Sequence, residues 1–298
     1  MGFGSYSFEA HAALTQARSQ KSTQEVFTQT SLHPSMNPFG VKHRESRDSK
    51  EHPRSLGIVF ALDVSGSMGE IPELLAKKEL PKFMKSLGDC GVESPQVLFM
   101  AFTDHEYDGR PLQVGQFETT AELMDQWLVR CSLSGGGAAA PAYASKTGQG
   151  FESYDLAFYF AAKHTAMDCW EKRKKKGYLF VTGDEPPYSH ARADVVKHVL
   201  GDTISDMPLG AVIEAAKETF EPFFLIPDAG RAQSIKDRWT PVLGDRVIVL
   251  EGPEDTTGVA AGLVALGEGS IKDAAALRAK VGERAARCLG PWLASNRR

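Results

Sequence analysis

The stretch Leu56–Met68, LGIVFALDVSGSM, decides the fold that this sequence predicts. Its first seven residues are an apolar run of strand length, which is typical of a strand buried on both faces of a sheet. A carboxylate and two hydroxyls follow at Asp63, Ser65 and Ser67, and the glycine between the serines allows a tight turn. Open α/β sheets bind ligands at the carboxyl ends of their strands, so this motif stands where a binding site is expected.

Further strand-like segments follow, and helical patterns lie between them. The strand-like segments are Val97–Phe102, Leu112–Phe117, Gly177–Val181, Pro222–Ile226 and Val247–Leu250. The helical patterns are Ile71–Leu87, which Pro81 should kink, Thr119–Leu128, Tyr154–Thr165, Val195–Leu200, Leu209–Thr219, Ala232–Trp239, Thr256–Leu266 and Ser270–Leu289. Thr119 and Glu122 have the spacing of a capping box. Alternating strands and helices predict a doubly wound, mostly parallel sheet of six strands with helices on both faces. Leu112–Phe117 alternates and follows a proline, so it is expected at an edge.

The composition of the 298 residues excludes several classes of protein. The net charge of -4 and the 42% hydrophobic content are ordinary for a soluble globular protein. No stretch approaches the ~20 apolar residues of a membrane span, and no secretory leader is visible. The four cysteines are scattered without a CxxC pair, which predicts reduced thiols in the cytoplasm. The charge gives no general nucleic-acid footprint.

The chain divides by composition into three segments. Residues 1–54 are a polar N-terminal arm, which is either flexible or wrapped over the domain through Phe27, Leu32 and Phe39. Residues 55–267 are predicted to form the α/β domain, and residues 268–298 a C-terminal helical extension.

The motif after the first strand favours a cation site. Oxygen donors at positions i, i+2 and i+4 of a tight turn can face one point, which suits Mg²⁺ or Mn²⁺. A nucleophilic serine elbow is excluded, because Asp63 and Ser65 stand where that motif needs glycine. No phosphate-binding GxxxxGK[ST] loop is present. The alternative is that Asp63 and the serines only cap the following helix.

Asp63-x-Ser65-x-Ser67 after an apolar strand resembles the metal-ion-dependent adhesion site of the von Willebrand factor A family. The resemblance implies a doubly wound sheet with one antiparallel edge strand, which Leu112–Phe117 would supply. It also implies a second donor from another loop and an Asp from a third loop. The stretch TGDEPP, residues 182–187, matches that third loop, with Asp184 at the position of the Asp. The chain is similar to uncharacterised bacterial and phage cytoplasmic proteins of this family.

The second loop departs from the family pattern. It has three glycines at 135–137, then an alanine-rich stretch, then KTGQGFES at 146–153. Thr147, Gln149 or Glu152 could supply the oxygen, and the sequence does not choose between them.

Two charged segments are expected on opposite rims of the sheet, one beside the predicted site and one away from it. The turn TDHEYDG at 103–109 lies on the same rim as Asp63, so Asp104 and His105, together with Glu185, are expected to contact the partner. The alternative is a solvated hairpin. The basic run Lys172–Lys176 falls on the opposite rim, where it is either a solvated face or a surface for nucleic acid or an acidic partner.

The expected function is a metal-dependent protein-binding module that captures an Asp or Glu of a partner, and not an enzyme. The resemblance adds that such bacterial modules serve as adaptors, among others for AAA+ ATPases. One alternative is a metal-assisted hydrolase with His105 or Glu185 as base. The other is a self-assembling subunit, in which arm carboxylates such as Glu45, Asp48 or Glu51 reach the ion of another copy.

Overall fold

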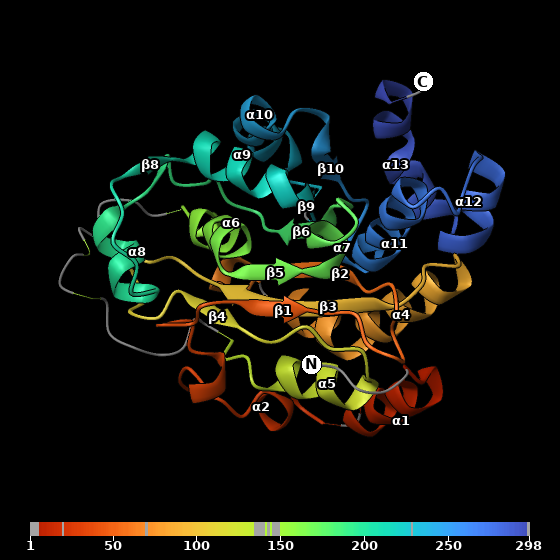
Figure 1. Ribbon diagram of the computed structural model, residues 1–298, viewed down its shortest axis with the longest axis horizontal. Helices are drawn as coiled ribbons and strands as arrows, with labels where there is room; N and C mark the ends of the chain where they lie inside the picture. Colours follow the sequence, from red (N-terminus) through yellow and green to blue (C-terminus); the bar gives the residue numbers. More distant parts are fainter. Residues whose placement is uncertain are drawn as a thin grey trace.

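A six-stranded sheet forms the centre of the molecule in the computed structural model, which describes residues 6–19, 21–68, 71–133, 141, 144, 150–227 and 229–296 (Figure 1). Its strands are β2 (Leu56–Asp63), β3 (Pro95–Phe102), β4 (Leu112–Val114), β6 (Gly177–Thr182), β9 (Phe220–Ile226) and β10 (Val247–Val249). Their order across the sheet is β10-β9-β6-β2-β3-β4, and only the β3–β4 pair is antiparallel. In chain order this is 3-2-1-4-5-6, the order of doubly wound nucleotide-binding sheets. The predicted fold class is confirmed.

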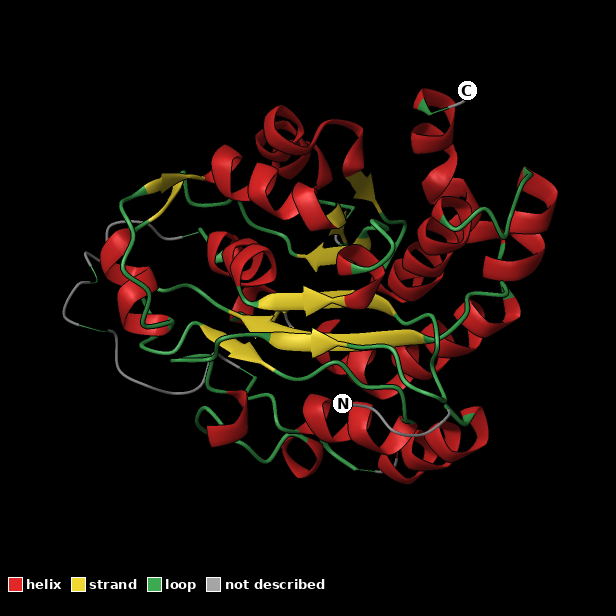
Figure 2. Ribbon diagram, in the orientation of Figure 1, coloured by secondary structure: helices red, strands yellow, loops and turns green. Residues whose placement is uncertain are grey.

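The central strands are buried because helices cover both faces (Figure 2). Helices α6 (Tyr154–Lys163), α9 (Leu209–Thr219) and α10 (Ala232–Leu243) pack on one face. The other face carries α4 (Leu80–Asp89), α5 (Ala121–Val129) and α11 (Thr256–Gly267). The shorter helices are α3 (Ile71–Leu74), α7 (Asp168–Glu171) and α8 (Ala193–Val199).

Three helix predictions differ from the structure. The predicted helix Ile71–Leu87 is divided into α3, a π-helical turn at Leu75–Glu79 and α4, and Pro81 stands in the first turn of α4. Thr120 rather than Thr119 caps α5, because its side chain accepts a hydrogen bond from the Leu123 amide. The predicted final helix is two helices, α12 (Ala274–Val281) and α13 (Glu283–Ser295). Gly282 between them has φ +89°, a conformation that ends a helix.

The N-terminal arm is wrapped over the domain in its described residues. Helices α1 (Phe8–Ser19) and α2 (Thr23–Val26) precede β1 (Arg44–Ser46), which pairs in parallel with β5 (Thr165–Met167). Helix α1 packs against α4 and α5 (Figure 1). A second small sheet joins β7 (His190–Ala191) to β8 (Met207–Pro208).

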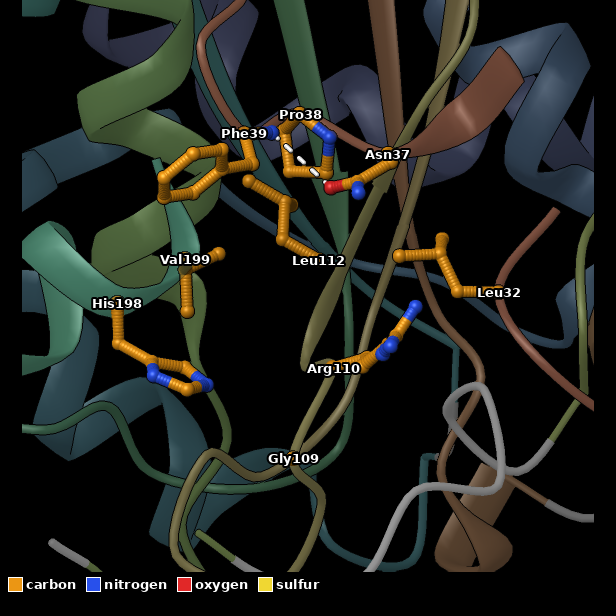
Figure 3. A pocket seen from close by; sticks show the side chains of 9 residues that line it. All are labelled: Leu32, Asn37, Pro38, Phe39, Gly109, Arg110, Leu112, His198 and Val199. Atoms are coloured by element: carbon orange, nitrogen blue, oxygen red, sulfur yellow. Dashed lines mark hydrogen bonds between the residues drawn. The ribbon is translucent and has the colours of Figure 1, made fainter. Parts of the chain in front are cut away.

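Two of the three predicted anchors of the arm are buried. Phe27 and Leu32 belong to the hydrophobic core, whereas Phe39 is 59% exposed. Figure 3 shows Leu32 and Phe39 facing Leu112 of β4 and Val199 of α8, across a pocket of about 150 Å³. Phe39 lines this pocket with Leu112 and Val199 but is not part of the hydrophobic core, so it buries less of its side chain than Phe27 and Leu32 do.

The C-terminal helices extend the core of the domain. Leu277 of α12 and Leu289 of α13 are buried against α11. No described helix is long and apolar enough to cross a membrane. The four cysteines are free and buried, and a cytoplasmic location stays a prediction.

Most of the basic run at the end of α7 is paired with carboxylates of the same chain. Arg173 donates a hydrogen bond to the carbonyl oxygen of Ser55, directly before β2 begins. Because Asp63 is the last residue of β2, the run lies at the opposite end of this strand. The ion pairs are Lys172 with Asp168 and Asp48, Arg173 with Asp48, Lys175 with Glu268, and Lys176 with Glu221. Since four of the five cations in the run have acidic partners within the chain, the structure favours a solvated face over a free basic patch for nucleic acid.

Candidate functional site

The register of the sheet brings the first and third loops together. Asp63, the last residue of β2, lies beside Phe102 of β3, and Leu62 lies beside Thr182 of β6. Asp184 stands two residues beyond the end of β6. The parallel pairing of β2 with β6 therefore places Asp63 and Asp184 at one edge of the sheet, as the sequence predicted.

Hydrogen bonds join the predicted ligand residues into one cluster. The Ser65 amide donates to Asp63 Oδ1 at 2.9 Å, and the hydroxyls of Ser65 and Ser67 are 2.9 Å apart. Ser67 Oγ donates to Asp184 Oδ1 at 2.9 Å. Asp63 is 0% exposed and Asp184 2%. The sequence-predicted donors Asp63, Ser65, Ser67 and Asp184 thus lie together.

Tyr154, the first residue of α6, connects the two loops. Its hydroxyl donates to Asp63 Oδ2 at 3.3 Å and accepts from the Glu185 amide at 3.2 Å. The third loop can approach this ring because residue 183 is glycine: a Cβ there would lie 2.2 Å from the Tyr154 hydroxyl.

Glu152 is the second-loop candidate that the structure brings to the site. Its side chain lines a hollow of about 550 Å³ together with Ser65, Ser67 and Thr103. Glu152 is 6% exposed, and its Oε2 has no hydrogen-bond partner among the described residues; the same holds for Thr103 Oγ1. Thr147 and Gln149, the other candidates, lie outside the described residues.

Burial raises the affinity of these carboxylates for protons. It raises the pKa of Asp63, hydrogen bonds from Ser65 oppose the rise, and the charge of Asp184 adds to it. Burial also raises the pKa of Glu152 strongly, and the charges of Asp63 and Asp104 add to that rise. Carboxylates packed this closely are stabilised by a nearby positive charge.

One positive side chain reaches this cluster from outside it. Arg231, directly before α10, places Nη1 3.1 Å from Asp184 Oδ2 and 2.6 Å from Glu185 Oε1. Glu185 is half-buried on the rim of the site, and its carboxylate forms an ion pair with Arg231.

The donor set has the chemistry that a hard cation prefers. It offers carboxylates, hydroxyls and one unpartnered buried carboxylate oxygen, all hard oxygen ligands. No group of three His, Cys, Asp or Glu side chains in the described part of the chain could hold a metal ion by itself. An ion here would therefore depend on the serine hydroxyls and on water as well as on Asp63 and Asp184.

Most of the turn at 103–109 is buried, so it is not a solvated hairpin, although Tyr107 is exposed. Asp104 is 8% exposed and accepts a hydrogen bond from the Tyr188 hydroxyl at 2.5 Å. His105 is 0% exposed, with its amide donating to Ser153 Oγ at 2.9 Å and its ring 4.1 Å from that of Tyr188. Burial lowers the pKa of His105 to about 4. Asp104 lines the hollow, but a partner could touch His105 only if this turn opened.

Sequence reasoning missed the roles of Tyr154 and Arg231. Tyr154 was assigned only to an apolar helix, although a phenol at its first turn can face a strand end. No local signal could have indicated Arg231, since it comes from a polar segment far along the chain.

Comparison with known proteins finds distant structural likenesses. No protein-family model and no curated protein sequence matches the chain. Solved structures of similar fold include the pilus adhesin SpaC from Lactobacillus rhamnosus GG in its open conformation, at 12% identity and TM-score 0.46, covering 74% of this chain and 31% of the adhesin. Proximal thread matrix protein 1 from the mussel byssus has 13% identity and TM-score 0.42, with coverages of 76% and 49%. A von Willebrand factor type A from Catenulispora acidiphila has 13% identity and TM-score 0.41, with coverages of 79% and 51%.

The chain thus spans about half or less of the length of these proteins. At such low identity and similarity, we take no conclusion about function from them.

Proposed function

We propose that this chain is a metal-dependent protein-binding module, in which Asp63, Ser65, Ser67 and Asp184 hold Mg²⁺ or Mn²⁺ and Glu152 supplies the oxygen of the second loop. The observation that carries the proposal is the joining of Asp63, Ser65, Ser67 and Asp184 through hydrogen bonds at the carboxyl edge of the sheet. The unpartnered oxygen of Glu152 supports it, because a buried carboxylate oxygen without a partner is costly.

The residues of this chain would leave room for a partner. The hollow of about 550 Å³ beside the serines is far larger than one ion and its waters need. Since serine hydroxyls and water would complete the coordination of a bound divalent cation, an incoming Asp or Glu could replace one of the waters. Exposed Tyr107 and buried Asp104, which also line the hollow, would then flank the acidic side chain.

Asp63→Asn tests the proposal with little change in shape. The amide keeps the size of the side chain but loses its charge, so we expect Mg²⁺ and Mn²⁺ affinity to fall by about 100-fold or more in isothermal titration calorimetry. An acidic-peptide array should be bound by the wild type with Mg²⁺, and neither by the wild type with EDTA nor by the variant.

The matched control is Asp237→Asn, an exposed carboxylate on α10, which should bind metal and peptides as the wild type does. Equal peptide binding under all conditions would contradict the proposal. A partner of the AAA+ ATPase class stays a prediction from the resemblance alone.

In each of the two alternative functions, the structure disfavours one of the candidate residues, His105 as a base and Asp48 as an arm carboxylate. A hydrolase needs a base that reaches its substrate, and the side chain of His105 is completely buried. A phosphatase and phosphodiesterase screen with Mg²⁺ or Mn²⁺ tests that prediction. Self-assembly through Asp48 would require breaking its bonds to Arg173 and Ser55 at the opposite edge of the sheet.

A further inference from the structure

Arg231 contacts both acidic residues of the third loop at the candidate site. Asp184 has one carboxylate oxygen turned to Ser67, at 2.9 Å, and the other to the guanidinium of Arg231, at 3.1 Å. The same Arg231 nitrogen is 2.6 Å from Glu185 Oε1. Both oxygens of Asp184 are thus engaged by side chains of this chain.

The charges around Arg231 explain why it lies there. Asp63, Asp184 and Glu152 are almost completely buried, and Glu185 is half-buried beside them. Burying carboxylates close together is unfavourable without a counter-charge. Arg231 reaches the two acidic residues of the third loop and supplies one.

Arg231 lies at the surface of the molecule, unlike the carboxylate that it contacts. Its side chain is 46% exposed, in contrast to 3% for the Asp184 side chain that it contacts. Since Arg231 is not part of the hydrophobic core, displacing its guanidinium from Asp184 does not require the core to repack.

We propose that Arg231 is the resident counter-cation of the metal-free site and competes with the divalent cation for Asp184, so that it sets the metal affinity of the module. This inference rests on the proposed function. A divalent ion held by Asp184 and a guanidinium on the same carboxylate would repel each other, so each binds at the expense of the other. The module would then keep its loops in place without metal and bind the ion more weakly than its donor set alone would.

The test compares Arg231→Ala with Arg238→Ala, which changes an exposed arginine on α10, the helix that Arg231 precedes. Titration calorimetry with Mg²⁺ and with Mn²⁺ should show an affinity about fivefold or more higher for Arg231→Ala than for the wild type. Arg238→Ala should match the wild type. Arg231→Lys keeps the charge but loses the planar guanidinium. Its metal affinity should lie between that of Arg231→Ala and that of the wild type.

A second readout does not depend on a calorimetric signal. In EDTA, Arg231→Ala should melt at a lower temperature than the wild type, because the carboxylates have lost their counter-charge. Added Mg²⁺ should then raise its melting temperature more than it raises that of the wild type.

The outcomes separate the two proposals. Metal binding by the wild type with equal or weaker binding by Arg231→Ala would overturn the competition and leave the metal site standing. Absence of Mg²⁺ and Mn²⁺ binding in every protein would overturn both. A tighter variant with a larger metal-induced shift supports both.

Discussion

At the scale of single residues, the candidate site depends on two that carry no charge. Tyr154 ties Asp63 to the Glu185 amide, and Gly183 makes room for its ring. A carboxylate motif can be read from a sequence, but the close approach of a loop to a phenol cannot. The position of Asp184 therefore depends on the lack of a side chain one residue before it.

Gly183→Ala should damage both the fold and the site. The added methyl group would lie 2.2 Å from the Tyr154 hydroxyl, so the loop or the ring must shift. We expect a loss of about 1–3 kcal/mol in the free energy of unfolding, measured in urea, and a weaker Mg²⁺ affinity.

Gly210→Ala is the matched control for that change. A Cβ at Gly210, in the first turn of α9, meets nothing within 4 Å, so alanine should be neutral or stabilise by up to about 1 kcal/mol. A Gly183→Ala protein as stable as this control would show that the third loop is not held by Tyr154.

At the scale of elements, the Asp48 carboxylate holds the arm against the domain. Asp48 accepts hydrogen bonds from the Ser55 amide at 3.0 Å and hydroxyl at 2.8 Å, and from Arg173 at 2.7 Å. These contacts fasten the segment after β1 to the start of β2. Burial alone would raise the pKa of Asp48, but the hydrogen bonds from Arg173 and Ser55 outweigh it and lower the pKa to about 2.

Asp48→Asn should destabilise the protein in a pH-dependent way. The folded pKa lies below that of the unfolded chain, so the contribution of Asp48 is complete above about pH 4 and is lost as the pH falls through 2. We expect a deficit of about 1–3 kcal/mol at pH 7, measured by urea unfolding, that narrows as the pH falls below 4.

The control for this prediction is Glu51→Gln, an exposed residue of the same arm, which should stay within about 0.5 kcal/mol of the wild type. A deficit that is the same at pH 7 and pH 3 would contradict the assignment to the charge of Asp48.

At the scale of the whole molecule, one hydrophobic core joins the segments that composition separates. It contains Phe27 of the arm, the sheet strands, and Leu289 of the last helix. Trp127 of α5 is buried on one side, and Trp292 of α13 packs edge-on against Phe223 at 5.9 Å on the other. The arm and the C-terminal helices therefore belong to the folded unit in the described structure.

A shared core predicts cooperative unfolding. Two variants that each keep one tryptophan, Trp127 or Trp292, should give coincident urea transitions by fluorescence and by circular dichroism. A Trp292 signal that changes at lower urea than that of Trp127 would indicate that the C-terminal helices unfold separately, as an independent extension would.

The prediction of the sheet succeeded where the pattern is local. The apolar runs of β2, β3 and β6 can only be buried between helix layers, and alternation with helical patterns makes the strands parallel. A prediction failed where one backbone angle decides, as at Gly282, which ends α12 and divides the predicted final helix. Glu152 stayed one of several candidates because loop residues have no periodic pattern that fixes their direction.

The sequence by itself determined the doubly wound sheet and the edge on which Asp63 and Asp184 meet, because strand hydrophobicity and parallel pairing leave few other arrangements. Only the tertiary structure decided what surrounds these carboxylates. It brought Arg231 to Asp184, Tyr154 to Asp63, and internal acidic partners to the basic run. These contacts join residues far apart in the chain, and their energies depend on burial and distance, which exist only after the chain has folded.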